Sequence, residues 1–133
     1  DFSSKDALER TLNMVGAFQD HVVMWGDGSV RRELMCSDDL ADACVYLMEN
    51  KNAADIGEFV NITDGTDILL RDLFELVRNI VGFAGRIEYD RTKPNGTPRK
   101  LMDASRIRAL GWTPHIALED GIAGAYEAYL SAV

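Results

Sequence analysis

The chain has 133 residues, 47% of them hydrophobic and 27% charged, which is the size and balance of one soluble globular domain with a real core. Its 22 acidic and 14 basic residues give a net charge of -8, so its field repels polyanions and argues against general affinity for nucleic acid or an anionic membrane. No apolar run approaches the length of a membrane span. We expect a cytoplasmic protein.

Hydrophobic spacing divides the first part of the chain into short elements. Apolar residues recur every three to four positions over residues 4–19, which predicts an amphipathic helix. Residues 21–25 are β-branched and apolar and predict a strand, and residues 26–29 predict a turn. Residues 32–36 resemble a second extended piece, and residues 37–49 begin with acidic residues that suit a helix N-terminus.

The remaining elements follow at short intervals. Alternation predicts a strand over residues 58–62, and one apolar stripe closed by Gly82 predicts the clearest helix, over residues 70–82. Further along we expect a strand at 86–89, a short helix capped by Asp103 and ending at 110–111, and a last helix at 118–131. The fold class is therefore α/β, with short strands packed with about five helices. No repeat or linker interrupts residues 1–133, so we predict a single domain.

The most distinctive stretch is residues 93–100, K-P-N-G-T-P-R-K. Two prolines four positions apart fix φ and remove two backbone donors, so this stretch should be a stiff loop and neither a helix nor an inner strand. Asn95 followed by Gly96 favours a turn with positive φ. A rigid basic loop in an acidic protein is a plausible holder of a charged ligand.

Motifs for catalysis, cofactor binding and metal binding are missing from the sequence. It contains no G-x-G-x-x-G, Walker loop, C-x-x-C or H-E-x-x-H, so we assign no catalytic residue and no metal site. His21 and His115 have no ligand cluster beside them and are expected to be surface histidines. The acidic residues at the start of the 37–49 helix are expected to cap it.

Two further patterns argue against functional roles that a motif search might suggest. Tyr89 and Lys93 have the Y-x-x-x-K spacing of short-chain dehydrogenases, but they run from a strand into a proline loop, so we interpret the spacing as coincidence. Cys36 and Cys44 fall at a predicted strand end and inside a predicted helix, which disfavours a disulfide and favours a reduced setting.

One aromatic residue and several basic residues together indicate a binding function. Trp25 ends a strand just before a Gly-rich turn, and Arg31 and Arg32 follow within seven residues. The central loop adds Arg91, Lys93, Arg99 and Lys100. An aromatic face for a base and cationic groups for phosphate suit a nucleotide diphosphate. The alternative is that Trp25 belongs to the core and the basic side chains are solvated.

Four segments, taken together, resemble one known family, the GDP-L-fucose synthases. Residues 23–33, V-M-W-G-D-G-S-V-R-R-E, resemble its V-W-G-[ST]-G-x-x-x-R-E-[FL] segment. Residues 93–103, K-P-N-G-T-P-R-K-L-M-D, are close to its K-P-D-G-T-P-R-K-L-x-D motif. Residues 38–43, D-D-L-A-D-A, and the L-G-W of residues 110–112 match in the same order. The resemblance runs from about Val22 to Leu130, and residues 1–20 fit weakly.

The resemblance implies a fold, an activity and separate roles for two domains. The family, part of the extended short-chain dehydrogenases, makes GDP-L-fucose from GDP-4-keto-6-deoxy-mannose by epimerisation and NADPH-dependent reduction. It uses an N-terminal Rossmann domain and a smaller C-terminal substrate domain, and this chain resembles only the second. Trp25, Arg32 and Lys100 would then contact GDP-sugar, and Asn95 stands where the family has an aspartate. The catalytic Ser-Tyr-Lys set and the NADP(H) site would belong to the Rossmann domain, so the chain alone should bind no cofactor and catalyse nothing.

Departures from the family pattern leave alternatives open. Asn95 can accept hydrogen bonds on one side only, where an aspartate accepts on both. Cys36-Ser37, Thr63-Asp64 and Leu69 also differ from the family. The chain could therefore be a free-standing sugar-nucleotide-binding or protein-interaction module, or it could serve another nucleotide-hexose. We expect the surface that would face a Rossmann domain to favour a homo-oligomer.

Overall fold

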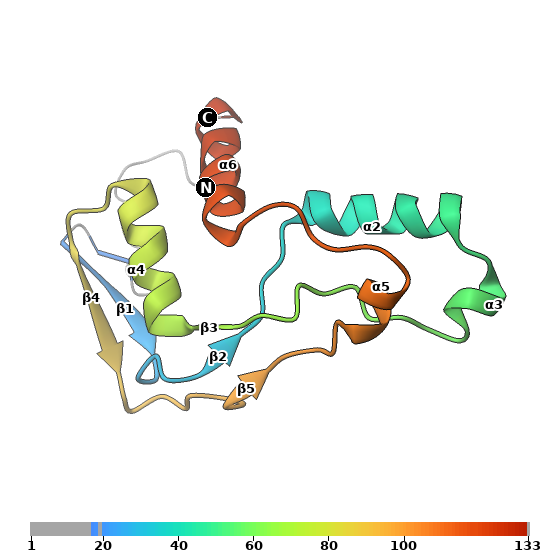
Figure 1. Cartoon of the computed structure of the whole chain (residues 1–133). Coiled ribbons are helices and arrows are strands. Elements are labelled where there is room, and N and C mark those ends of the chain that lie inside the picture. The colour runs from blue at the N-terminus through green and yellow to red at the C-terminus, as the bar shows by residue number, and fades with distance from the viewer. Residues whose placement is uncertain (1–16, 19, 133) are drawn as a thin grey trace, which may run out of the picture. The chain divides into compact units, whose positions relative to one another are not determined.

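The structure is a computed structural model that describes residues 17, 18 and 20–132 (Figure 1). Its residues form two compact units. The first contains the described residues up to Val30 together with Leu69–Pro98, and the second contains Arg31–Ile68 and the described residues from Arg99 onward. Strand β3, Ile68–Leu69, contains the point where the chain passes from the second unit back to the first.

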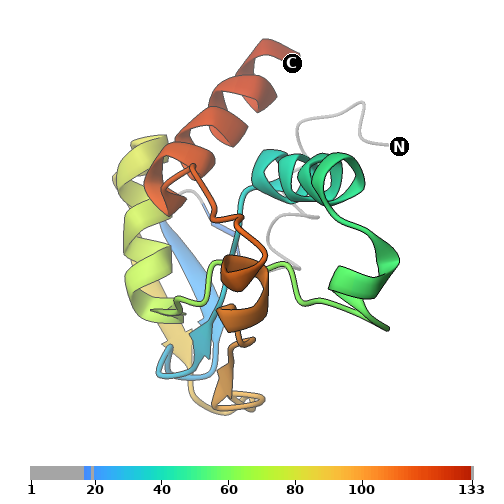
Figure 2. The ribbon, with the colours of Figure 1, turned by 45° about the vertical axis from the view of Figure 1, so that its right-hand side comes forward.

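The first unit is built on a pair of parallel strands. Strand β1, His21–Trp25, pairs with β4, Arg86–Asp90, in a register that places Trp25 opposite Asp90. Helix α4, Leu70–Val81, lies beside this pair, where Phe74 packs against Tyr89 with 6.5 Å between ring centroids (Figures 1 and 2). The helix ends as predicted at Gly82, which has φ +69°. Because β1 and β4 are parallel, their carboxyl ends and the loops that follow lie at one edge.

The second unit combines four helices with strands of a small three-stranded sheet. In this sheet β2, Arg31–Arg32, lies between β3 and β5, Arg99–Lys100, and it pairs in parallel with β5. The helices are α2, Ser37–Asn50; α3, Ala53–Ile56; α5, Ser105–Ala109; and α6, Leu118–Ala132. Their core consists of buried side chains from α2, α5 and the segments that flank α5: Ala43, Leu47, Ala104, Ile107 and Trp112.

Several predictions about local structure are confirmed. The strands at 21–25 and 86–89 and the helices at 37–49, 70–82 and 118–131 are present within one or two residues. The helix predicted after Asp103 is present as α5, but its N-cap is Ala104 and not Asp103, although the Asp103 carboxylate accepts a hydrogen bond of 2.8 Å from the Ser105 amide. Cys36 and Cys44 are free thiols. Five helices occur among the described residues, and none of them is long and apolar enough to cross a membrane.

Other predictions are wrong. Residues 58–62 form no strand, and α3 lies just before them in a stretch to which the sequence analysis assigned no element. The extended piece predicted at 32–36 is a strand only at β2, and the last two residues of the predicted proline loop form β5. Of the helix predicted over residues 4–19, residues 1–16 and 19 lie outside the described part, and Ala17 makes an isolated antiparallel bridge to Val22 instead of a helical turn.

Candidate functional site

In the first unit, hydrogen bonds join the loop after β1 to the loop after β4. The Gly26 amide donates to the Asp90 carbonyl at 2.9 Å, and the Asp27 amide donates to Oδ1 of Asn95 at 2.8 Å. Gly26 has φ +83°, and a Cβ at this position would collide with the Asn95 side chain. Asn95 therefore contacts the turn that follows Trp25, and the structure brings these two predicted site residues to the same edge.

Trp25 is exposed at this edge. Its side chain is 70% accessible, which excludes the alternative that it belongs to the core of the described structure. The Lys93 ammonium lies 5.7 Å from the centroid of its ring, within the range of a cation–π contact. An open aromatic face beside a cation can stack on a flat ring and attract an anion.

Asp27 adds a negative charge to the same turn. Its carboxylate accepts a hydrogen bond of 2.9 Å from the Ser29 amide. Hydrogen bonding from Ser29, together with Asn95 and the charge of Arg91, holds the pKa of Asp27 below its usual value. Asp27 is thus an acceptor at neutral pH, and it can bind hydroxyl or amino groups but not phosphate.

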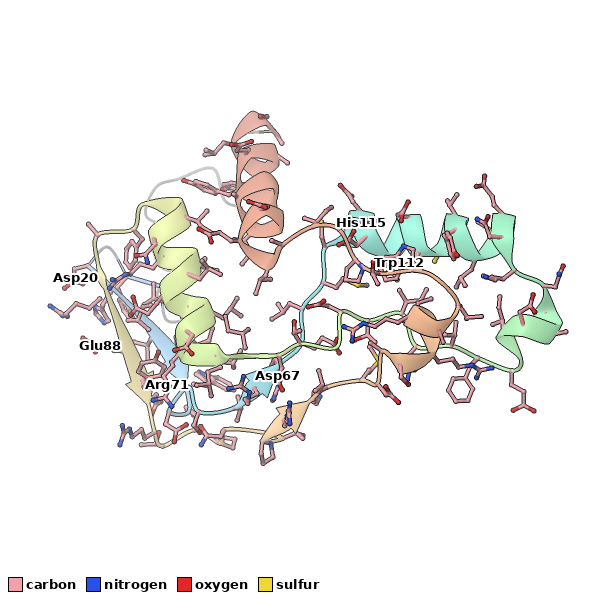
Figure 3. All side chains as sticks on the ribbon, in the orientation of Figure 1. Asp20, Asp67, Arg71, Glu88, Trp112 and His115 are labelled. Carbon is pink, nitrogen blue, oxygen red and sulfur yellow. The ribbon has the colours of Figure 1, made fainter. Side chains whose placement is uncertain are left out.

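In the second unit, the first residues of β2 and β5 share one buried carboxylate. Nε of Arg31 donates to Oδ1 of Asp67 at 2.5 Å, and Nε of Arg99 donates to Oδ2 of the same side chain. The Asp67 side chain is only 3% exposed (Figure 3). Burial alone would raise the pKa of Asp67, but the hydrogen bonds from Arg99 and Arg31 outweigh it and lower that pKa.

The second residues of the same two strands are the predicted phosphate ligands. Arg32 and Lys100 are direct partners in the parallel register, so their side chains leave the same face of the strand pair, opposite Arg31 and Arg99. Lys100 is exposed, and its ammonium makes no hydrogen bond or ion pair with any residue that the structure describes. Arg32 is half-buried, donates to the Arg31 carbonyl at 2.7 Å, and lines a cavity of about 80 Å³.

Glu33 fixes the segment that follows β2. One of its carboxylate oxygens accepts hydrogen bonds from the Thr63 hydroxyl and, at 2.7 Å, from the Gly65 amide. The other accepts a bond of 3.1 Å from the Met102 amide. Sequence reasoning missed the roles of Glu33 and Asp67. The R-E pair of the family motif was a signal for Glu33, whereas nothing local marks Asp67.

The acidic residues at the start of α2 do not cap it, contrary to the prediction. The N-cap is Cys36, which makes no side-chain capping bond. Asp39 is buried and accepts bonds of 3.0 Å from the amides of His115 and Ile116, and Asp42 accepts one of 2.8 Å from the Trp112 indole (Figure 3). These carboxylates connect α2 to the 112–116 segment.

Neither histidine belongs to a metal site among the described residues, where no group of three or more ligand side chains occurs. Nδ1 of His21 lies 2.7 Å from a carboxylate oxygen of Asp20, and Nε2 of His115 lies 4.0 Å from one of Asp42. Tyr89 lies in β4 and Lys93 in the following loop, so the Y-x-x-x-K pair does not share a helix face, as expected. Burial, with the charge of Glu75 adding to it, raises the pKa of Tyr89.

Acidification is expected to destabilise the fold. Five carboxyl groups have a pKa lowered by hydrogen bonds or neighbouring cations: Asp20, Asp27, Asp67, Asp90 and Asp103. A lowered folded-state pKa means that the unfolded chain binds more protons, so the stabilisation is complete above about pH 4 and is lost as pH falls through the folded-state values. Urea unfolding at pH 7, 5, 4 and 3 measures this, and a free energy of unfolding that stays constant or rises down to pH 3 would contradict it.

Comparison with known proteins shows which family the chain resembles. The model of the NAD dependent epimerase/dehydratase family matches residues 4–63. The putative GDP-L-fucose synthase 2 of Arabidopsis thaliana is 51% identical over 114 residues, which are 86% of this chain and 34% of the relative. A GDP-6-OMe-4-keto-L-xylo-heptose reductase from Campylobacter jejuni is similar in structure, with a TM-score of 0.91 and 36% identity over 98% of this chain and 40% of that one.

A second solved structure agrees. The GDP-D-glycero-L-gluco-heptose synthase of Campylobacter jejuni matches with a TM-score of 0.85 and 36% identity over 96% of this chain and 38% of that one. The chain spans about a third of the length of the curated relatives it matches, for example 34% of the Arabidopsis protein. These matches confirm the predicted fold class and the resemblance to GDP-L-fucose synthase. By sequence and by fold, the chain is similar to members of the NAD-dependent epimerase/dehydratase family, and it matches about one third of the length of GDP-L-fucose synthase.

Proposed function

We propose that this chain is the GDP-sugar-binding part of a GDP-L-fucose synthase-like epimerase/reductase and does not catalyse the reaction alone. The observation that carries the proposal is the cross-strand pair Arg32 and Lys100, two cations in register on one strand face. In this proposal the diphosphate of the ligand neutralises both charges, with Arg32 as the planar two-point donor and Lys100 as the point charge.

Trp25 and Asn95, in the first unit, are assigned to the ligand through the family motif alone. Trp25 offers an exposed ring on which a base or a sugar can pack. Asn95 orients the ligand through the side-chain nitrogen, since its oxygen already accepts the Asp27 amide. The relatives support GDP over other nucleotides, because the two Campylobacter proteins and the Arabidopsis protein all carry GDP-sugars in their names.

The residues present do not fit a nicotinamide cofactor. One relative was crystallised in the presence of NADPH, and a dinucleotide site needs a Gly-rich turn between a strand and the N-terminus of a helix. In this chain the turn after β1, with Gly26 and Gly28 at positive φ, leads into strand β2 instead. We therefore assign NADP(H) and hydride transfer to a partner Rossmann domain, in a cytoplasmic enzyme.

The test is titration of the 133-residue chain with GDP, UDP and dTDP by calorimetry. GDP should bind most tightly, and Lys100→Ala should weaken GDP about tenfold, because one charge-assisted contact to phosphate is lost. Arg86→Gln is the matched control, since it removes a positive charge whose side chain is 68% exposed at the amino end of β4. Equal affinity of Lys100→Ala and wild type for GDP would contradict the proposal. A preference for UDP or dTDP would mean that the ligand is a UDP-sugar or dTDP-sugar and not a GDP-sugar.

A protein-interaction module is the second candidate function. It is favoured by the exposed apolar face of α2, where Leu40, Val45 and Met48 are 45%, 47% and 75% accessible. The same titration separates the candidates. Absence of any nucleotide binding, together with a mass that rises with concentration in light scattering, would favour the module and the homo-oligomer.

A further inference from the structure

We infer that Asp27 determines the specificity for the base of the nucleotide, by accepting hydrogen bonds from guanine beside the exposed ring of Trp25. The inference rests on the proposed function, because it assigns the guanine of the GDP-sugar to one place in the chain. It uses residues of the first unit alone, and none of its steps involves the phosphates.

The argument begins with the place of Asp27 in the fold. The turn that contains Asp27 follows β1, and the loop that contains Asn95 follows β4, so both lie at the carboxyl ends of two parallel strands. In open parallel sheets, ligands bind outside this edge. An aromatic ring lies at the same edge, with the Lys93 ammonium 5.7 Å from the centroid of the Trp25 ring.

The second step is that the turn is fixed by distant parts of the first unit. The Asp27 amide donates to Oδ1 of Asn95 at 2.8 Å, across 68 residues of sequence. The Gly28 carbonyl accepts the amide of Arg71, at the start of α4, at 3.1 Å. Asp27 is therefore held between two segments that lie far from it along the chain, and a preorganised acceptor binds a ligand with a smaller loss of entropy than a mobile one.

The third step is the hydrogen-bonding capacity of the Asp27 side chain. Oδ1 of Asp27 accepts the Ser29 amide at 2.9 Å, and hydrogen bonding from Ser29 holds the pKa of the carboxyl group below its usual value. An ionised carboxylate has about four acceptor positions, so it can accept further N–H groups. Guanine offers two adjacent donors, N1–H and the N2 amino group, whereas uracil and thymine offer one N–H between two carbonyl oxygens.

The fourth step joins the carboxylate to the neighbouring ring. Trp25 is 70% accessible, so a flat base can stack on it. Stacking on an aromatic side chain tolerates every base, because every base has a π-face. Selection must therefore come from groups that contact the edge of the base, and Asp27, two positions along the chain, is an ionised acceptor of this kind.

The experiment titrates the 133-residue chain with guanosine and inosine, which carry no phosphate and differ only in the N2 amino group. Binding is followed by the indole N–H signal of Trp25 in NMR spectra. Wild type should bind guanosine several-fold more tightly, because inosine lacks one of the two donors. Asp27→Asn should weaken guanosine about tenfold and inosine much less, since an amide accepts through one oxygen only.

Asp90→Asn is the matched control. The Asp90 carboxylate also accepts an amide two residues further along, from Thr92 at 3.0 Å, and it lies at the end of β4. The variant should keep the wild-type preference for guanosine. Should Asp27→Asn not fold by circular dichroism, Asp27→Ser replaces it, because a serine hydroxyl can form the same local turn bond.

Several results would overturn the inference. Equal affinity of wild type for guanosine and inosine would do so without any variant, and so would the absence of binding of either. A folded Asp27 variant that keeps the preference for guanosine, or that weakens both nucleosides in equal proportion, would show a role in the turn only.

The GDP titration with Lys100→Ala tests the proposed function separately. If GDP binding depends on Lys100 and wild type shows no preference for guanosine, the inference alone is contradicted. If the preference depends on Asp27 but Lys100→Ala binds GDP as wild type does, the phosphate contact of the proposed function is contradicted and the assignment of Asp27 stands.

Discussion

Replacing Ile107 with alanine is expected to lower the free energy of unfolding by about 2 to 5 kcal/mol, the range for large-to-small changes in a packed core. Ile107 lies in α5 and is completely buried. Two of its core neighbours, Ala43 and Ala104, are already alanines, so they cannot extend to fill the space. The expected loss is therefore toward the upper end of the range. Urea unfolding monitored by circular dichroism measures it.

The matched control is Leu130→Ala. Leu130 lies in α6 and is 52% exposed, so removing a similar number of methyl groups there should cost less than about 1 kcal/mol. If the two variants lose the same free energy of unfolding, Ile107 does not lie at the centre of the core that α5 shares with α2.

Replacing Asp39 with alanine is expected to cost about 3 kcal/mol. The Asp39 side chain is 2% exposed and accepts the amides of His115 and Ile116, each at 3.0 Å. Removal leaves both amides without an acceptor, and each such loss costs about 1 to 3 kcal/mol in a buried setting. The loss of unfolding free energy for Asp39→Asn should lie between zero and the loss for Asp39→Ala, because an amide oxygen can replace only one of the two carboxylate oxygens.

The neighbouring Asp38 provides the control for this second prediction. Asp38 is exposed in the first turn of the same helix, so Asp38→Ala removes the same charge near the helix N-terminus without breaking a buried bond. Its cost should be below about 1 kcal/mol. Similar losses for the two alanine variants would mean that Asp39 acts on α2 through its charge alone, as the sequence had suggested.

The sequence predicted helices better than strands, and the reason is physical. Helix α4 is specified by residues within a few turns of one another, namely its apolar stripe and the glycine at its end. A strand needs a neighbour as well as a pattern. Residues 58–62 alternate correctly, yet no other strand among the described residues pairs with them, and Phe59 remains 67% exposed.

The residues of the candidate site also differ in whether the sequence could reveal them. Trp25, Arg32, Asn95 and Lys100 could be proposed because their segments match a family motif, and their roles stay proposals. Asp67 could not be found from its neighbours along the chain, since its partners Arg31 and Arg99 are 36 and 32 residues away. Asp39 was visible, but it was interpreted as a local cap because its true partners lie 76 and 77 residues further along.

The alternation along β2 and β5 has a consequence for comparing this chain with its relatives. In each two-residue strand the side chain of the first position binds Asp67 and that of the second lies on the opposite face, although all four residues are basic. Exchanging Arg99 and Lys100 would conserve charge, composition and length, and an alignment would score it as conservative. The exchange would nevertheless place a lysine against the buried carboxylate of Asp67 and the arginine on the opposite face. The order of these two basic residues therefore matters as well as their number.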